Sequence, residues 1–133
     1  MIYSTITFRR PGLQDSAQSE SDDAITGLRR ATWISSHLHD FNATKFDKEP
    51  IAEDWGYAVR VFVGTDTLLL GFSSAFEDDP DRWRLVISDN FNRGLLPQTQ
   101  KRRQAELVRL SDFVKRVLVD SDGVSDVQIE LRS

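Results

Sequence analysis

The sequence contains no cysteine, and this absence removes several functional classes at once. Without thiols there is no disulfide framework, no thiolate zinc site and no cysteine nucleophile. Long apolar runs are also missing, because the most apolar stretch, residues 57–72, is interrupted by Arg60 and Asp66. That stretch falls short of the roughly 20 apolar residues that a membrane helix needs. The N-terminal residues lack the cationic start and apolar region of a secretory signal, so we expect a cytoplasmic protein.

Motifs that identify an enzyme are missing as well. There is no G-x-S-x-G elbow, phosphate-binding glycine loop, dinucleotide fingerprint or H-E-x-x-H zinc motif. The only histidines are His37 and His39, and a helix would turn their side chains about 200° apart. The acidic turn at residues 77–81 lacks the spaced ligands and the glycine of a calcium loop. We expect no metal site, no cofactor and no catalytic residues, and an enzyme without a recognisable motif is kept as an alternative.

The chain does have enough apolar material for a single domain spanning residues 1–133. Hydrophobic residues make up 39% of it, which can offset the backbone entropy lost on folding. The net charge of −4 argues against broad contact with phosphates, which requires clustered cations. The charge is unevenly distributed, because residues 91–116 carry seven cations and two acids, whereas residues 15–23 and 77–81 are acidic.

Strands are indicated by alternating or β-branched apolar residues. Residues 2–8 alternate and end at Pro11-Gly12, and residues 127–131 alternate near the other end of the sequence. Between them, turn residues 64–67 separate two apolar runs and predict an antiparallel hairpin. The expected strands are residues 2–8, 57–63, 68–74, 83–88 and 127–131. The polar residues 42–56 are expected to be an exposed loop, as are residues 89–99.

Two helices are indicated by apolar residues at spacings of three and four. The first begins at Ser21, an N-cap followed by two acids that complement the helix dipole, and ends near residues 40–42. Its expected core positions are Ala24, Leu28, Ala31, Ile34, Leu38 and Phe41. The second spans roughly residues 100–119, with apolar positions Leu107, Leu110, Val114, Val117 and Leu118.

The resulting order is β-α-β-β-β-α-β. Because each helix has one apolar face, we expect an α+β two-layer sandwich: a mainly antiparallel five-stranded sheet with two helices on one face. The terminal strands are candidates for pairing between chains, so the pattern leaves monomer and homodimer open.

The segment Glu53-Asp54-Trp55-Gly56-Tyr57 is a candidate recognition edge for a protein partner. It places an aromatic pair beside two acids, and Trp and Tyr bury a large area at low entropic cost. The competing interpretation is that Trp55 covers the core where a loop enters a strand. Both interpretations are kept.

A second candidate surface is basic. Lys101, Arg102 and Arg103 lie on the second helix, and Arg93 precedes it in the loop. These cations could meet an acidic protein or, less consistently with the overall acidity, a nucleic acid. Most of them are expected to lie off the apolar face as solvated charges.

The combined pattern favours a non-catalytic protein-interaction domain, for example a small bacterial regulatory, inhibitor-like or immunity-type protein. One alternative is a small-molecule-binding protein or an enzyme with a pocket between sheet and loops, using Glu53, Asp54, His37 and Arg93. The other is a nucleic-acid-binding protein that uses the basic second helix. The expected partner is a protein of unknown identity, with no membrane contact.

Overall fold

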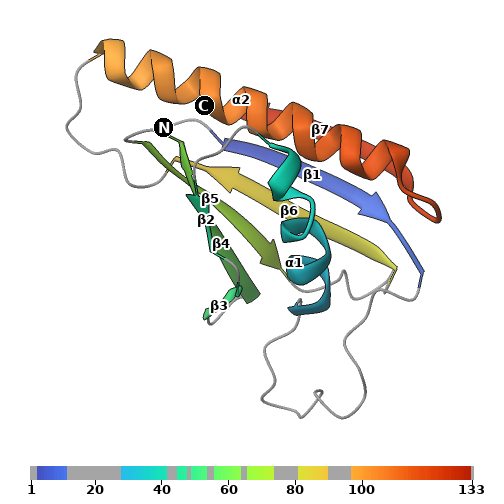
Figure 1. Ribbon diagram of the computed structural model, residues 1–133. Coiled ribbons are helices and arrows are strands. Elements are labelled where there is room, and N and C mark those ends of the chain that lie inside the picture. The colour runs from blue at the N-terminus through green and yellow to red at the C-terminus, as the bar shows by residue number, and fades with distance from the viewer. Residues whose placement is uncertain are drawn as a thin grey trace.

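The computed structural model describes residues 3–11, 28–41, 45–47, 49–53, 56–63, 66–73, 81–89 and 97–132. In these residues the chain forms an antiparallel sheet with both α-helices on one face (Figure 1). The strands are β1 (Tyr3–Arg9), β2 (Lys45–Phe46), β3 (Ile51–Glu53), β4 (Gly56–Val63), β5 (Asp66–Ser73), β6 (Arg82–Ser88) and β7 (Ser125–Arg132). The helices are α1 (Leu28–Ser35), the 3-10 turn η1 (Leu38–Asp40) and α2 (Pro97–Asp120). The α+β class is confirmed.

The expected number of strands was wrong, because the described sheet has seven strands rather than five. The additional strands, β2 and β3, lie in the segment expected to be loop, and both pair with β4. They contain two and three residues, too few for an alternating pattern to stand out from a polar loop. Residues 97–99 were also expected to be loop, and they form the first turn of α2.

The sheet order is β2-β4-β5-β6-β1-β7, with β3 also on β4. The predicted hairpin is confirmed as β4 and β5, paired from Gly56↔Ser73 to Val63↔Asp66. Asp66 and Thr67, expected in the turn, are therefore strand residues. The strand nearest the N-terminus, β1, lies between β6 and β7, so of the two terminal strands only β7 is at an edge.

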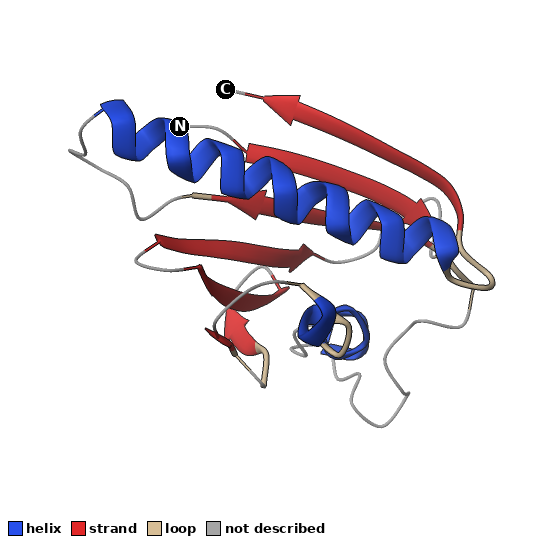
Figure 2. Cartoon of the chain, turned by 45° about the horizontal axis from the view of Figure 1, so that its top comes forward, coloured by secondary structure: helices blue, strands red, loops and turns tan. Residues whose placement is uncertain are grey.

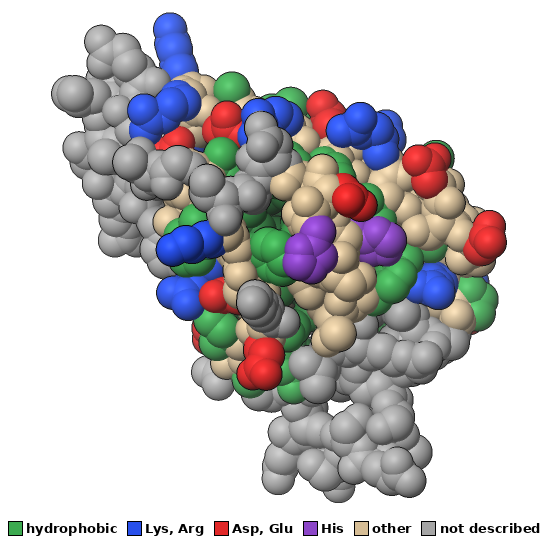
Figure 3. Space-filling model, in the orientation of Figure 1, with side chains coloured by type: hydrophobic (Ala, Val, Ile, Leu, Met, Phe, Trp, Pro, Cys, Tyr) green, Lys and Arg blue, Asp and Glu red, His purple; other side chains and the backbone are tan. Residues whose placement is uncertain are grey.

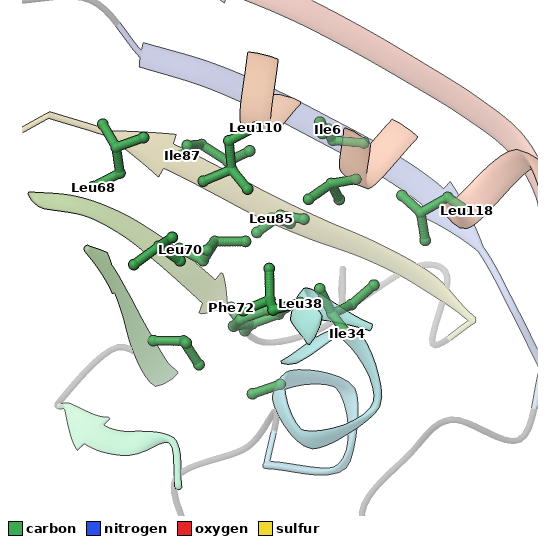
Figure 4. Close-up of a cluster of buried hydrophobic side chains, with 14 of the residues drawn as sticks. Ile6, Ile34, Leu38, Leu68, Leu70, Phe72, Leu85, Ile87, Leu110 and Leu118 are labelled. Carbon is green, nitrogen blue, oxygen red and sulfur yellow. The ribbon is translucent and has the colours of Figure 1, made fainter. Parts of the chain in front are cut away.

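Both helices cover the same face of the sheet, and α2 lies between α1 and β7 in projection (Figure 2). Alternation in the strands directs every second side chain toward the helices: Ile6 and Phe8 from β1, Leu68 and Leu70 from β5, and Leu85 from β6. Figure 4 shows four of these side chains, Ile6, Leu68, Leu70 and Leu85, on the side of the sheet where Ile34, Leu38, Leu110 and Leu118 of the helical layer lie.

All but one of the described apolar positions predicted for the helices are confirmed as core. Side chains that are almost completely buried include Ala31, Ile34, Leu38, Phe41, Leu107, Leu110, Val114 and Leu118. Val117 is only partly buried. The predicted N-cap at Ser21 and the side chains of Ala24 and Leu28 lie outside the residues whose side chains are described.

Candidate protein-binding surface

The predicted recognition edge lies where β3 turns into β4. Glu53 is the last residue of β3 and is exposed, and it pairs with Gly56. Tyr57 is partly buried and packs against the hydrophobic core. Its ring therefore contributes to the fold as well as to the surface. Asp54 and Trp55 lie outside the described residues.

Two arginines of the predicted basic surface, Arg102 and Arg103, form ion pairs within the molecule. Asp66, at the start of β5, accepts two hydrogen bonds from Arg102, each 3.0 Å long. Arg103 adds an ion pair of 3.2 Å to the same carboxylate. Asp66 and Arg103 have side-chain exposures of only 3% and 8%, whereas Arg102 is 55% exposed. Two of the three expected helix cations are thus engaged with the first residue of β5.

This cluster has a clear electrostatic consequence. The hydrogen bond from Arg102 holds the pKa of Asp66 below its usual value, and the charges of Arg102 and Arg103 act in the same direction against the effect of burial. Arg103 continues the buried stripe of α2 that includes Leu107, so it was wrongly expected to be a surface cation. Its Nε and Nη1 atoms are buried and have no hydrogen-bond partner among the described residues.

The remaining predicted cations give little continuous positive surface. Lys101 is exposed on α2, and Arg93 lies outside the described residues. Arg109, further along α2, forms an ion pair with Glu106 and stacks over Phe41. Figure 3 shows acidic and basic side chains interspersed along the rim that α2 occupies. Three of the described cations of α2, Arg102, Arg103 and Arg109, form ion pairs with Asp66 or Glu106.

The proposed pocket residues do not converge among the described parts of the chain. His37 lines a groove of about 440 Å³ between the η1 region and the C-terminal part of α2, together with Asp40, Phe113, Arg116, Val117, Asp120 and Ser121. Glu53 is not among the residues that line this groove. Asp54 and Arg93, the other two members of that set, are not described.

The two histidines contact different aromatic rings. His37 meets the edge of Trp33 at 6.1 Å between ring centroids, and His39 meets Phe46 at 5.1 Å. The first helix was expected to reach residues 40–42, but α1 ends at Ser35, so His37 lies in the turn after it and His39 lies in η1. In the described residues, no three His, Asp or Glu side chains are grouped so that they could hold a metal ion. The described helices also include none that is long and apolar enough to cross a membrane.

The sequence named both terminal strands as candidates for pairing between chains, and of these two β7 lies at an edge of the described sheet. Among the described strands, β7 pairs with β1 alone, and most of its residues are exposed. It is eight residues long, and Figure 2 shows it along the margin of the sheet. The opposite edge differs, because β4 is covered there by the short strands β2 and β3. Short strands and bulges are the usual protection of a sheet edge.

The backbone groups at the β7 edge can be assigned from the hydrogen bonds of β1. The Arg10 N–H donates to the Asp81 carbonyl at 2.9 Å, so even-numbered residues of β1 direct their backbone groups toward β6. Odd-numbered residues therefore face β7, where their partners are Gln128, Glu130 and Arg132. The intervening residues Ile129 and Leu131 direct their N–H and C=O groups away from the sheet.

Side chains on β7 alternate in the same way. Val127 and Ile129 pack against the core on the helix side, and Leu131 follows them but is 46% exposed. Gln128, Glu130 and Arg132 lie on the open face, where Arg132 Nη2 is 2.7 Å from Glu130 Oε1. The strand begins with a bulge at Asp126 and Val127, which together oppose Phe8. Asp126 has a positive φ of 53° and binds Arg82 at 3.2 Å.

Comparison of the chain with protein-family models, with curated proteins and with solved structures gave no match in any of the three. The functional interpretation therefore depends on the residues and the geometry of this molecule alone.

Proposed function

We propose that this chain is a non-catalytic protein-interaction domain that binds an extended segment of its partner along the outer edge of β7. The observation that carries the proposal is the regular row of backbone donors and acceptors at Ile129 and Leu131, on a strand paired on one side only among those described. Addition of a strand to such an edge is a common mode of peptide and protein recognition.

The side chains of β7 are suited to this mode of binding. On the helix side, exposed Leu131 offers an apolar contact, and on the open face Gln128, Glu130 and Arg132 offer polar contacts. Backbone hydrogen bonds would provide affinity, and these alternating side chains would provide specificity. Glu53 and Lys101, exposed elsewhere, are kept as additional contacts for a large partner.

The proposal is tested by replacing a backbone donor without disturbing the fold. Leu131→Pro removes the outward N–H, and proline is tolerated on the free side of an edge strand. Leu131→Ala is the matched control, because it shortens the side chain and keeps the N–H. Tagged wild-type protein and both variants are used to capture partners from a lysate of the native host.

The expected result is a protein retained by the wild type and by Leu131→Ala but lost with Leu131→Pro. In the purified complex, hydrogen exchange of the Ile129 and Leu131 amides should slow. If captured proteins bind Leu131→Pro as well as they bind the wild type, the β7 edge is not the binding surface.

A second candidate function is the binding of a small polar ligand in the groove between the η1 region and the C-terminal part of α2. Its specific support is the combination of an apolar floor, Phe113 and Val117, with ionisable groups of both signs from Asp40 and Arg116. A ligand screen monitored by thermal unfolding, repeated with Arg116→Ala, tests this function. A ligand that raises the unfolding temperature of both proteins equally would place the binding elsewhere.

A further inference from the structure

We propose that the partner at the β7 edge is a second copy of this chain, bound antiparallel so that the two sheets become continuous. This inference depends on the proposed function of the same edge and specifies its occupant. A two-fold axis perpendicular to the sheet would pass between the two copies of Ile129, placing Val127 opposite Leu131 and Gln128 opposite Glu130. Both helical layers would then lie on the same side of the joined sheet.

The backbone geometry favours this register. Ile129 and Leu131 both direct their N–H and C=O groups outward, and Val127, whose side chain packs against the core as that of Ile129 does, is assigned the same direction. In the proposed pairing each outward residue therefore faces another outward residue. A shift of one residue would place the outward N–H and C=O groups of one copy opposite residues of the second copy whose backbone groups are already bonded to β1. It would also place apolar side chains opposite polar ones.

Two other symmetric registers, shifted by two residues in either direction, would also pair outward residues with outward residues. The charges of the side chains distinguish the proposed register from these two. Shifting by two residues in one direction places Glu130 opposite Glu130, and shifting in the other places Asp126 opposite Glu130. Like charges directly across a ladder are destabilising. In the proposed register Glu130 faces neutral Gln128, and the residues at the two ends, Asp126 and Arg132, have opposite charges.

The apolar side chains are consistent with the same arrangement. Leu131 is 46% exposed and would meet Val127 of the second copy on the helix side. Exposed apolar side chains beside an open backbone edge are unusual in a chain that stays monomeric, because edges are normally protected by charge or shortening.

The pairing would also be self-limiting. The bulge at Asp126 ends the regular ladder of β7. In the dimer the β7 edge of each copy is paired with the β7 edge of the other copy, so neither edge is left open to a third chain. The other edge of the described sheet is interrupted by β2 and β3, so a closed dimer is expected rather than a filament. The contact area of two short strands is small, and we expect a dissociation constant on the order of 10 µM.

The experiment measures the molar mass of the purified full chain by sedimentation and light scattering over roughly 1 to 500 µM. The wild type and Leu131→Ala should shift from monomer to dimer, and Leu131→Pro should stay monomeric with an unchanged circular dichroism spectrum. A wild type that is monomeric throughout overturns this inference, and leaves the proposed function to be decided by the host-lysate experiment.

A charge exchange tests the register independently, including the case in which Leu131→Pro fails to fold. Gln128→Glu places two acids opposite each other at two symmetric positions and should weaken the dimer by about threefold to tenfold. Adding Glu130→Lys to Gln128→Glu replaces the repulsion with attraction and should restore the dimer. A dimer that neither Gln128→Glu nor the double variant changes would place the interface away from the proposed ladder.

Discussion

At the residue scale, the most informative group is Asp66. The residue types at positions 64–67 predicted a hairpin turn that includes Asp66. They gave no indication that its carboxylate would be buried against α2 in contact with two arginines. The arginines come from a segment 36 and 37 positions later in the sequence. Local patterns cannot report such a contact, because it forms only when α2 crosses the end of the sheet.

We expect Asp66→Asn to lower the free energy of unfolding by about 2 to 4 kcal/mol. The substitution leaves Arg103 buried without its carboxylate, and unpaired buried charge is costly. The measurement is urea unfolding at neutral pH. Asp47→Asn is the control, because Asp47 pairs with the exposed Arg60 and should lose less than about 1 kcal/mol. Equal losses in the two variants would contradict the structural role assigned to Asp66.

The same carboxylate predicts a pH dependence. The pKa of Asp66 is lowered in the folded state, so its contribution to stability is present above the ordinary value of about 3.9 and is lost as the pH falls through the folded-state pKa. Between neutral pH and pH ~3, the wild type should therefore lose more stability than Asp66→Asn. Urea midpoints of both proteins across this range provide the check, and parallel curves would assign the acid sensitivity to other groups.

At the scale of the element, α2 is positioned by an apolar stripe and by polar contacts, of which the cluster around Asp66 is one. Ser111 on α2 and Ser4 on β1 share a buried hydrogen bond of 2.7 Å. The apolar stripe was predicted from its spacing. The hydroxyl pair was not, because a serine on an amphipathic helix gives no indication of which residue it meets.

We expect Ser4→Ala and Ser111→Ala each to destabilise the protein by about 1 to 2 kcal/mol, because each leaves the other hydroxyl buried without its partner. The double variant should cost clearly less than the sum of the two. A double-mutant cycle from thermal or urea unfolding measures this coupling. Additive losses would mean that the two hydroxyls are not coupled in solution.

The start of β4 depends on glycine for steric reasons. Gly56 has a φ of +155°, and a Cβ atom there would lie 2.0 Å from the carbonyl oxygen of Phe72 on β5. We expect Gly56→Ala to destabilise the protein by about 3 kcal/mol or more, measured by urea unfolding. Gly123→Ala is the control: Gly123 also has a positive φ, but apart from its chain neighbours no atom of the described residues lies within 4 Å of a Cβ at that position, so about 1 kcal/mol is expected. A smaller loss for Gly56→Ala than for Gly123→Ala would contradict this packing.

At the scale of the whole molecule, the two edges of the sheet determine how it can associate. One edge of the described sheet consists of the short strands β2 and β3, which pair with β4, and the other edge is the long strand β7. The alternating residues 127–131 predicted a half-buried strand, which is confirmed. Its place at the edge follows from the insertion of β1 between β6 and β7, and strand order is not encoded in the pattern of any single strand.

Association at β7 predicts that thermal stability depends on protein concentration. A dimer that forms only from folded chains stabilises the native state by mass action, so the unfolding temperature of the wild type should rise with concentration. The unfolding temperature of Leu131→Pro should not change. Calorimetry at several concentrations measures both, and a wild-type unfolding temperature independent of concentration would contradict the dimer.

The sequence by itself determined the α+β class, the two helices, the longer strands and nearly all of the described core, because hydrophobic periodicity is a local property that the chain carries before it folds. The tertiary structure decided the rest: the short strands β2 and β3, the burial of Arg103 against Asp66, and the edge position of β7. Each of these depends on contacts between segments far apart in the sequence. Such contacts are set by how the helices and strands pack together, which no local pattern specifies.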